Sequence, residues 1–156
     1  MIGSITYISF IILMGSIIYQ DFRFRTIGVG TLLVFLGLSI LIGNQEVFWE
    51  IWLRNVGINL GFVVVQLLGI TLWMSWKEGT LVNIADRYLG WGDILFFIPM
   101  ALLFPPIFFV YFYVGSLLMI LVGFLLYQAI APNPMSTIPL AGGLALCLIV
   151  TLLFIY

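Results

Sequence analysis

The chain has 156 residues and a net charge of −1; 64% of its residues are hydrophobic and only 7% are charged. A soluble domain has roughly a quarter charged residues, so this composition excludes an ordinary soluble protein and indicates a polytopic membrane protein. The chain has no histidine, and Cys147 is its one cysteine, so an internal disulfide is excluded and carboxylates are the main ligands left for a metal. We expect no metal, no cofactor and, without a basic tract, no nucleic-acid partner.

Six apolar runs predict an all-α fold with about six transmembrane helices, forming a single membrane-embedded domain over residues 1–156. A spanning helix needs about 20 apolar residues. The predicted spans are Ile2–Gln20, Ile27–Ile42, Val56–Trp76, Asp93–Phe104, Ile107–Gln128 and Ile138–Tyr156. The first run has no basic segment before it and no small-residue cleavage site after it, so we interpret it as a retained helix rather than a signal peptide.

Prolines and charges define the connections between these runs. Pro105-Pro106 predicts a turn after the fourth run, which Pro99 also interrupts, and Pro132 with Pro134 predicts a connection before the last run. The charges of the segment 46–54 are spaced four residues apart and share one helical face. This spacing predicts an amphipathic turn in the outer membrane interface, before the third span.

The distribution of basic residues predicts the orientation of the chain. Arg23 and Arg25 lie in the first loop and Lys77 and Arg87 in the third, whereas the loops on the other side contain only Arg54. Because cytoplasmic loops carry an excess of lysine and arginine, loops one, three and five are predicted to be cytoplasmic. Both chain termini are then outside.

Two acids stand at the edges of apolar runs. Asp21 follows the first run and Asp93 opens the fourth, so alternating spans place both at the cytoplasmic face. An ionisable residue in such a segment is costly and suggests a functional site. Two carboxylates that approach closely share one proton, so that one activates a water while the other donates to a carbonyl. This is the chemistry of an aspartic protease, and it needs no histidine or metal.

Each acid also has a purely structural interpretation. Asp21 is an interfacial charge paired with Arg25 four residues on, and Asp93 is a helix N-cap. Asp86 is a rival for the second acid, although it stands apart from any apolar run. The glycines before Asp93 either allow a close backbone approach with positive φ or only a flexible, closely packed helix start.

Three segments resemble the type IV prepilin peptidases. Residues 21–27 (DFRFRTI) are similar to the first aspartate motif of that family, Gly90-Trp91-Gly92-Asp93 to its GxGD motif, and 138–146 (IPLAGGLAL) to its last helix. The resemblance covers essentially the whole chain. It implies an aspartic endopeptidase of the cytoplasmic membrane that cleaves the positively charged leader of type IV pilin-like or pseudopilin precursors at the cytoplasmic face. Asp21 and Asp93 would then be the catalytic pair, supported by Gly90 and Gly92, with the substrate-binding residues unknown.

The chain departs from the family pattern at several points. Gly28 stands where the family often has proline, and Leu95 where a lysine often follows the second aspartate. Larger members of the family carry an N-terminal cytoplasmic insert with paired cysteines that goes with N-methylation of the product. The first loop here is short and has no cysteine, so the resemblance implies peptidase activity without N-methyltransferase activity. The short form also resembles archaeal preflagellin peptidases, which makes an archaellin-type precursor an alternative substrate.

Two other functions remain open from the sequence. One is a non-catalytic membrane scaffold or assembly subunit with the same fold. The other is a small channel or carrier with Asp21 and Asp93 on a polar path. The uncharged amides available for such a path are few: Gln20, Asn59, Gln66 and Gln128.

Overall fold

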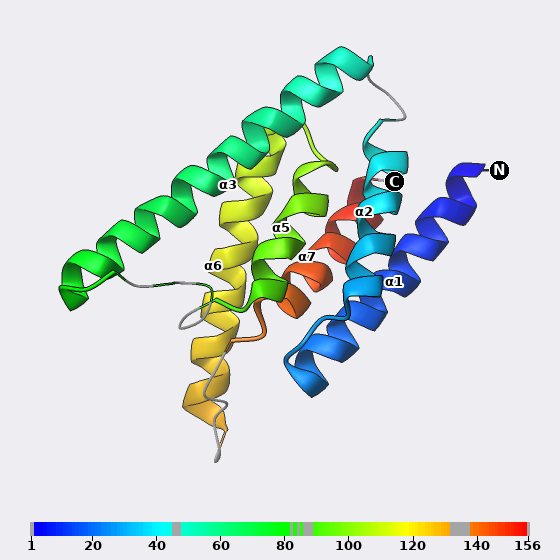
Figure 1. Cartoon of the computed structure of the whole chain (residues 1–156). Helices are drawn as coiled ribbons and strands as arrows, with labels where there is room; N and C mark the ends of the chain where they lie inside the picture. Colours follow the sequence, from blue (N-terminus) through cyan, green and yellow to red (C-terminus); the bar gives the residue numbers. More distant parts are fainter. Residues whose placement is uncertain are drawn as a thin grey trace. The chain divides into compact units, whose positions relative to one another are not determined.

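The computed structural model describes residues 2–44, 48–81, 83, 85, 89–131 and 138–155 (Figure 1). The regular elements in these residues are helices, which confirms the all-α prediction, and each predicted apolar run corresponds to one of them. The helices are α1 (Ile2–Phe24), α2 (Val29–Gly43), α3 (Trp49–Glu78), α5 (Trp91–Ala101), α6 (Pro106–Ile130) and α7 (Leu140–Ile155). Some residues used in the predictions lie outside the described part of the chain: Glu46, Asp86, Arg87, Pro132 and Pro134.

The helices fall into two length classes. α1, α3 and α6 are long and apolar enough to cross a membrane. α2, α5 and α7 are also apolar but have only 15, 11 and 16 residues. Because an α-helix rises 1.5 Å per residue, α5 is only about 16 Å long. That is roughly half of the ~30 Å hydrocarbon core of a bilayer.

α3 begins earlier than the hydropathy pattern predicts. Its first residue is Trp49, so residues 49–54 are its first turns and not a separate interfacial segment. Trp49 and Trp76 are 54% and 79% exposed near the two ends of this helix. The helix between them is about 40 Å long, close to the ~40–45 Å of a bilayer with its headgroups. Tryptophan is enriched at both membrane interfaces, so α3 has the pattern of a spanning helix with an aromatic residue at each boundary.

The chain divides into two compact units, Met1–Phe35 with Val110–Tyr156, and Leu36–Phe109. In the first unit α1 packs against α7 (Figure 1). Its core contains fully buried side chains from both helices, including Phe10, Met14, Leu144 and Leu148. The Phe10 ring meets that of Phe35 edge to face, with centroids 5.7 Å apart. The single domain predicted for residues 1–156 stays a prediction.

The turn between α1 and α2 is held by one side chain. Gln20 Nε2 donates to Thr31 Oγ1 at 3.0 Å, and the Gly28 N–H donates to Gln20 Oε1 at 2.9 Å. Arg25, the residue after α1, has a left-handed backbone (φ 56) that stops the helix. Its N–H still donates to the Asp21 carbonyl at 3.1 Å. The last turn of α1 is therefore fixed by local hydrogen bonds, and the position of Asp21 with it.

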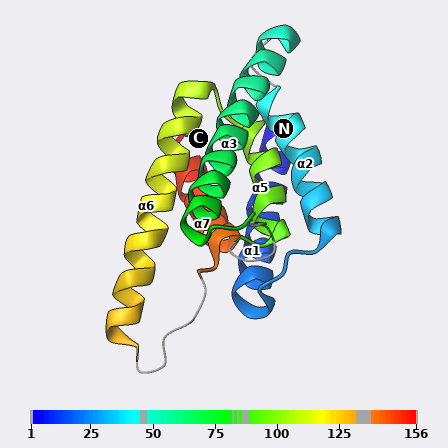
Figure 2. The ribbon, with the colours of Figure 1, turned by 60° about the vertical axis from the view of Figure 1, so that its left-hand side comes forward.

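In the second unit α3 packs beside α5 (Figure 2). α5 ends at Ala101 and α6 begins at Pro106, which confirms the predicted turn at Pro105-Pro106. Pro99 lies inside α5, two residues before its end. Proline lacks an N–H and favours chain reversal after a helix, so these prolines account for the short length of α5.

Side chains of α3 satisfy the carbonyl groups at the end of α5. Asn59 Nδ2 donates to the carbonyl oxygens of Ala101 and Phe104, at 2.9 and 2.8 Å. Trp52 Nε1 donates to the Leu102 carbonyl at 3.2 Å. Asn59 and Trp52 are both buried. The last carbonyls of a helix lack partners within it, so α3 supplies the donors that α5 needs to end in an apolar environment.

Candidate active site

Asp21 lies in the last turn of α1, three residues before the helix ends. Its side chain is only 6% exposed, and it is the one charged side chain that is buried among those the structure describes. The interpretation of Asp21 as an interfacial charge reaching to the surface is therefore wrong. Arg25 still attracts the carboxylate electrostatically from the next turn. A buried carboxylate needs hydrogen-bond donors, because the cost of removing its charge from water is otherwise several kcal/mol.

The donor to Asp21 is the backbone of α7. The Gly142 N–H donates to Asp21 Oδ2 at 2.6 Å, joining residues that are 121 positions apart. Gly142 is the third residue of α7, and the first backbone bond of this helix runs from the Gly143 N–H to the Pro139 carbonyl. The first N–H groups of a helix have no partner within it and attract anions. Asp21 therefore binds the positive end of α7.

Glycine allows a close approach at the point where α1 meets α7. A Cβ on Gly142 would lie 2.9 Å from the Phe22 ring and 3.0 Å from Asp21 Oδ2. A Cβ on the next residue, Gly143, would lie 2.7 Å from Ile120 of α6. At each of these three contacts an added side chain would force its neighbour to shift, so this glycine pair permits the close approach that brings the α7 backbone to the carboxylate.

The sequence pattern does not single out Gly142, which lies within the segment 138–146 that resembles the last helix of a family. The available signal is the Gly-Gly pair inside an apolar run, because a membrane helix uses small residues where a neighbour comes close. The pair does not indicate which residue comes close, so its contact with Asp21 was not predictable.

Asp93 occupies the first turn of α5 but is not its N-cap. The N-cap is Gly90, with an extended backbone (φ −69, ψ 148), and Asp93 is the third residue of the helix. The Asp93 N–H donates to the Gly90 carbonyl at 3.1 Å. Asp93 Oδ2 is 3.6 Å from where a Cβ on Gly90 would be, so the carboxylate turns back toward the helix start. There the helix dipole stabilises a negative charge.

The glycines of the GxGD segment do not use positive φ. Gly79 is the one described glycine with a positive φ, and Gly92 lies inside the first turn of α5. A Cβ on Gly90 would make only ordinary van der Waals contact. Of the two alternatives for these glycines, the one with positive φ is therefore excluded. The site residue at which a side chain would crowd its neighbours is Gly142.

The structure describes four acidic residues, and the two predicted site residues, Asp21 and Asp93, are less exposed than the other two. Asp21 is buried and Asp93 partly buried, whereas Glu50 and Glu78 are exposed. Asp21 belongs to the first compact unit and Asp93 to the second. The structure brings Asp21 to Gly142 and Asp93 to Gly90; the pairing of the acids with each other stays a prediction. Within the described residues, no three histidine, cysteine, aspartate or glutamate side chains form a potential metal site.

The apolar helices, the aromatic residues at both ends of α3 and the internally satisfied helix ends define a helical membrane protein. No protein-family model, curated protein or solved structure matches the chain. These comparisons do not test the resemblance of residues 21–27, 90–93 and 138–146 to the prepilin peptidases, which stays a prediction.

Proposed function

We propose that the protein is an aspartic endopeptidase of the cytoplasmic membrane that removes the leader of type IV pilin-like, pseudopilin-like or archaellin-like precursors at the cytoplasmic face. The observation that carries this proposal is the buried carboxylate of Asp21, held by the Gly142 amide at 2.6 Å. A chain with 7% charged residues places one of them in its interior and provides a backbone donor for it. A buried acid in an apolar, charge-poor protein is a candidate for proton transfer.

The proposed reaction uses Asp21 and Asp93 as a pair that shares one proton. The ionised acid takes a proton from a water molecule, whose oxygen attacks the carbonyl carbon of the scissile peptide bond. The protonated acid gives its proton to the carbonyl oxygen, forming a tetrahedral diol. When the diol collapses, the C–N bond breaks, the leaving nitrogen takes up one proton and the pair regains the other. Oδ2 of Asp21 is bonded to Gly142, so Oδ1 is the oxygen assigned to this transfer.

A non-catalytic scaffold is the second candidate. It is supported by the same hydrogen bond, because the Asp21–Gly142 contact also joins α1 to α7. A channel has less support, since two of the four amides proposed for a polar path have structural bonds instead. Gln20 holds the α1–α2 turn, and Asn59 donates to the end of α5.

Cleavage of a precursor peptide by the purified protein in lipid vesicles separates these functions. The peptide carries a short basic leader followed by an apolar segment. Asp21→Asn and Asp93→Asn are each expected to lower kcat by at least about 100-fold, the lower range for loss of a general acid or base. Asparagine has nearly the same size and still accepts the Gly142 N–H, so the fold is expected to remain. Glu50→Gln, at an exposed acid, is the control and should cleave normally.

Two results would contradict the proposal in different ways. Normal cleavage by either aspartate variant would remove that acid from the catalytic pair. Failure of the folded wild-type protein to cut bacterial and archaeal precursor peptides would reject the peptidase and favour the scaffold. Circular dichroism of all four proteins checks that the comparison is made between folded molecules.

A further inference from the structure

Two neighbouring side chains of α1 each accept a backbone N–H from the start of another helix. Asp21 Oδ2 accepts the Gly142 N–H of α7. Gln20 Oε1 accepts the N–H of Gly28, the residue before α2, whose carbonyl in turn accepts the Leu32 N–H at 3.1 Å. Successive side chains of a helix point about 100° apart, so Gln20 faces α2 while Asp21 faces α7. The last turn of α1 is therefore held from two sides.

The amide group of Gln20 uses both of its ends. Because a backbone N–H can only donate, Oε1 faces Gly28, and the Nε2 group then faces two hydroxyls. Nε2 donates to Thr31 Oγ1 in the first turn of α2 at 3.0 Å, and to Ser16 Oγ one turn earlier on α1 at 3.2 Å. A side chain needs a donor and an acceptor on one planar group to make these bonds. Gln20 thus connects the end of α1 to the first turn of α2.

The connection between α1 and α2 contains a backbone conformation that has to be held in place. Arg25 has a positive φ (56°), which is unfavourable for a residue with a side chain. Such a conformation persists where the surrounding contacts determine it. The bonds of Gln20 to Gly28 and Thr31 span this turn from α1 to α2. They are the contacts that keep the turn, and the end of α1 with it, in one arrangement.

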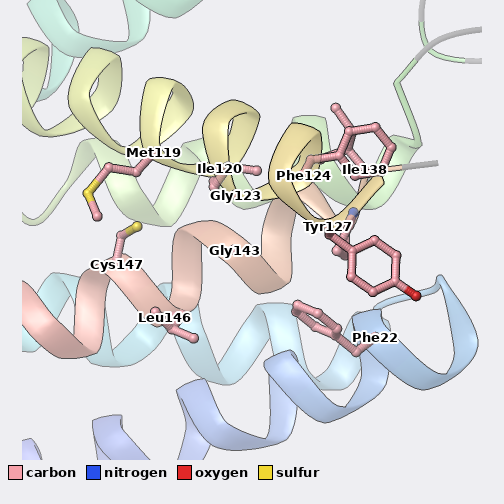
Figure 3. A pocket seen from close by; sticks show the side chains of 11 residues that line it. Phe22, Met119, Ile120, Gly123, Phe124, Tyr127, Ile138, Gly143, Leu146 and Cys147 are labelled. Atoms are coloured by element: carbon pink, nitrogen blue, oxygen red, sulfur yellow. The ribbon is translucent and has the colours of Figure 1, made fainter. Parts of the chain in front are cut away.

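The contact on the other side of α1 leaves little room for rotation. Figure 3 shows the Phe22 ring extending from the end of α1 toward α6 and α7. The ring is 2.9 Å from where a Cβ on Gly142 would be, and Asp21 Oδ2 is 2.6 Å from the Gly142 nitrogen. A hydrogen bond weakens steeply when its angle changes. A rotation of the last turn of α1 would therefore weaken the bond between Asp21 and Gly142.

We propose that Gln20 is a positioning residue for Asp21. Its bonds to the start of α2 fix the rotation of the last turn of α1 and thereby the direction of the Asp21 carboxylate. The inference rests on the proposed function and adds to it a residue that acts through Asp21. Loss of the Gln20 amide is expected to loosen the bond between Asp21 and Gly142 and to slow the chemical step.

The first measurement does not depend on cleavage: it is the hydrogen exchange of the Gly142 N–H, followed by NMR in detergent micelles. Gln20→Ala should speed this exchange about fivefold, the effect of about one net hydrogen bond. Asp21→Ala, which removes the acceptor itself, sets the upper limit. The N–H of Leu148, buried in the middle of α7, should keep its wild-type rate. An unchanged rate at Gly142, or equal acceleration at both positions through general destabilisation, would overturn the inference.

Two further variants make the exchange measurement specific to the bonds of Gln20. Gln128→Ala, at an exposed glutamine of α6, is the matched control and should leave the exchange of Gly142 unchanged. Thr31→Val has nearly the same size and removes one acceptor of Gln20, so it should speed the exchange about twofold. In the Gln20→Ala background the same change should have no further effect, because both residues act through one contact. Independent effects of the two changes would contradict the inference.

Cleavage of the precursor peptide in vesicles is the second measurement. Gln20→Ala should lower the kcat of the folded protein about tenfold and change KM by less than about twofold, because a misdirected catalytic group slows the reaction without altering substrate binding. Wild-type kcat, or a raised KM at normal kcat, would overturn the positioning role while the peptidase stands. If the wild-type protein cleaves no precursor, the peptidase fails, and the exchange of Gly142 still decides whether Gln20 directs Asp21.

Discussion

Each compact unit completes one helix end with groups from another helix, but the two units use different chemistry. In the first unit the carboxylate of Asp21 accepts the Gly142 N–H at the start of α7. In the second, Asn59 and Trp52 donate to three carbonyls at the end of α5. The second unit needs no ionisable group for this purpose. Neutral acceptors such as asparagine and serine also serve helix N-termini, so the first unit has a charge that capping alone does not require.

The comparison implies that the two contacts can be separated by mutation. Changes at the Asp21–Gly142 contact should reduce cleavage more than they reduce stability. Changes at the Asn59 and Trp52 contacts should reduce stability and leave the activity of the folded protein unchanged. The following variants test this, from the largest expected effect to the smallest.

Gly142→Ala should have the largest effect. The new Cβ would lie 2.9 Å from the Phe22 ring and 3.0 Å from Asp21 Oδ2, so it pushes both the ring and the carboxylate away from their present positions. A displacement of about 1 Å at a catalytic group can cost roughly 100-fold in rate, and we expect a loss of kcat of that order. Gly15→Ala is the control, because its Cβ on α1 meets no atom within 4 Å. Wild-type kcat in Gly142→Ala would contradict the positioning of Asp21 by this contact.

Asn59→Leu should destabilise the second unit. The substitution leaves the Ala101 and Phe104 carbonyls without the donor that now binds both. Each buried carbonyl left unpaired costs about 1–3 kcal/mol. Chemical unfolding in detergent micelles measures the loss, with Asn55→Leu, at a less buried position of α3, as the control. A drop in kcat of the folded protein, without a loss of stability, would show that Asn59 acts in the site instead.

Trp52→Phe should have the smallest effect. It removes the N–H that donates to the Leu102 carbonyl at 3.2 Å and keeps most of the aromatic packing. The net contribution of one such hydrogen bond is about 1 kcal/mol, so a small decrease in the free energy of unfolding is expected. The same unfolding assay measures it. No change, or a loss as large as that of Asn59→Leu, would contradict the assignment of one carbonyl to Trp52 and two to Asn59.

The sequence was sufficient to predict most of the helices, because hydropathy and proline positions determine where an apolar helix can run. It predicted the turn at Pro105-Pro106 and placed Asp21 and Asp93 near helix ends. It misplaced the start of α3, since the charges of Glu50 and Arg54 lower the local hydropathy without stopping the helix. Those first turns are held by the bond from Trp52 to Leu102, a long-range contact that no local pattern contains.

The sequence selects Asp21 and Asp93 as candidate residues but does not reveal the contacts that they make. Charge scarcity was enough to select Asp21, because an ionisable group beside an apolar run is costly. The partner of Asp21 is a backbone N–H, which leaves no mark in a sequence beyond the glycine that exposes it. The N-cap interpretation of Asp93 rests on the preference of aspartate for that position, but Gly90 is the N-cap of α5. The sequence therefore identifies the carboxylate of Asp21, whereas its position is set by the backbone of Gly142, which is 121 residues away in the chain.

The proposed peptidase depends on Asp21 and Asp93 acting as one pair, although they belong to different compact units. Cross-linking tests it most directly: Asp21→Cys and Asp93→Cys are combined in a Cys147→Ser background and treated in vesicles with a short bifunctional maleimide. Tyr19→Cys with Phe24→Cys, whose native rings are exposed and 6.0 Å apart, is the positive control. The account predicts an efficient cross-link within one chain for the 21–93 pair. An efficient cross-link in the control pair with none between positions 21 and 93 would contradict it.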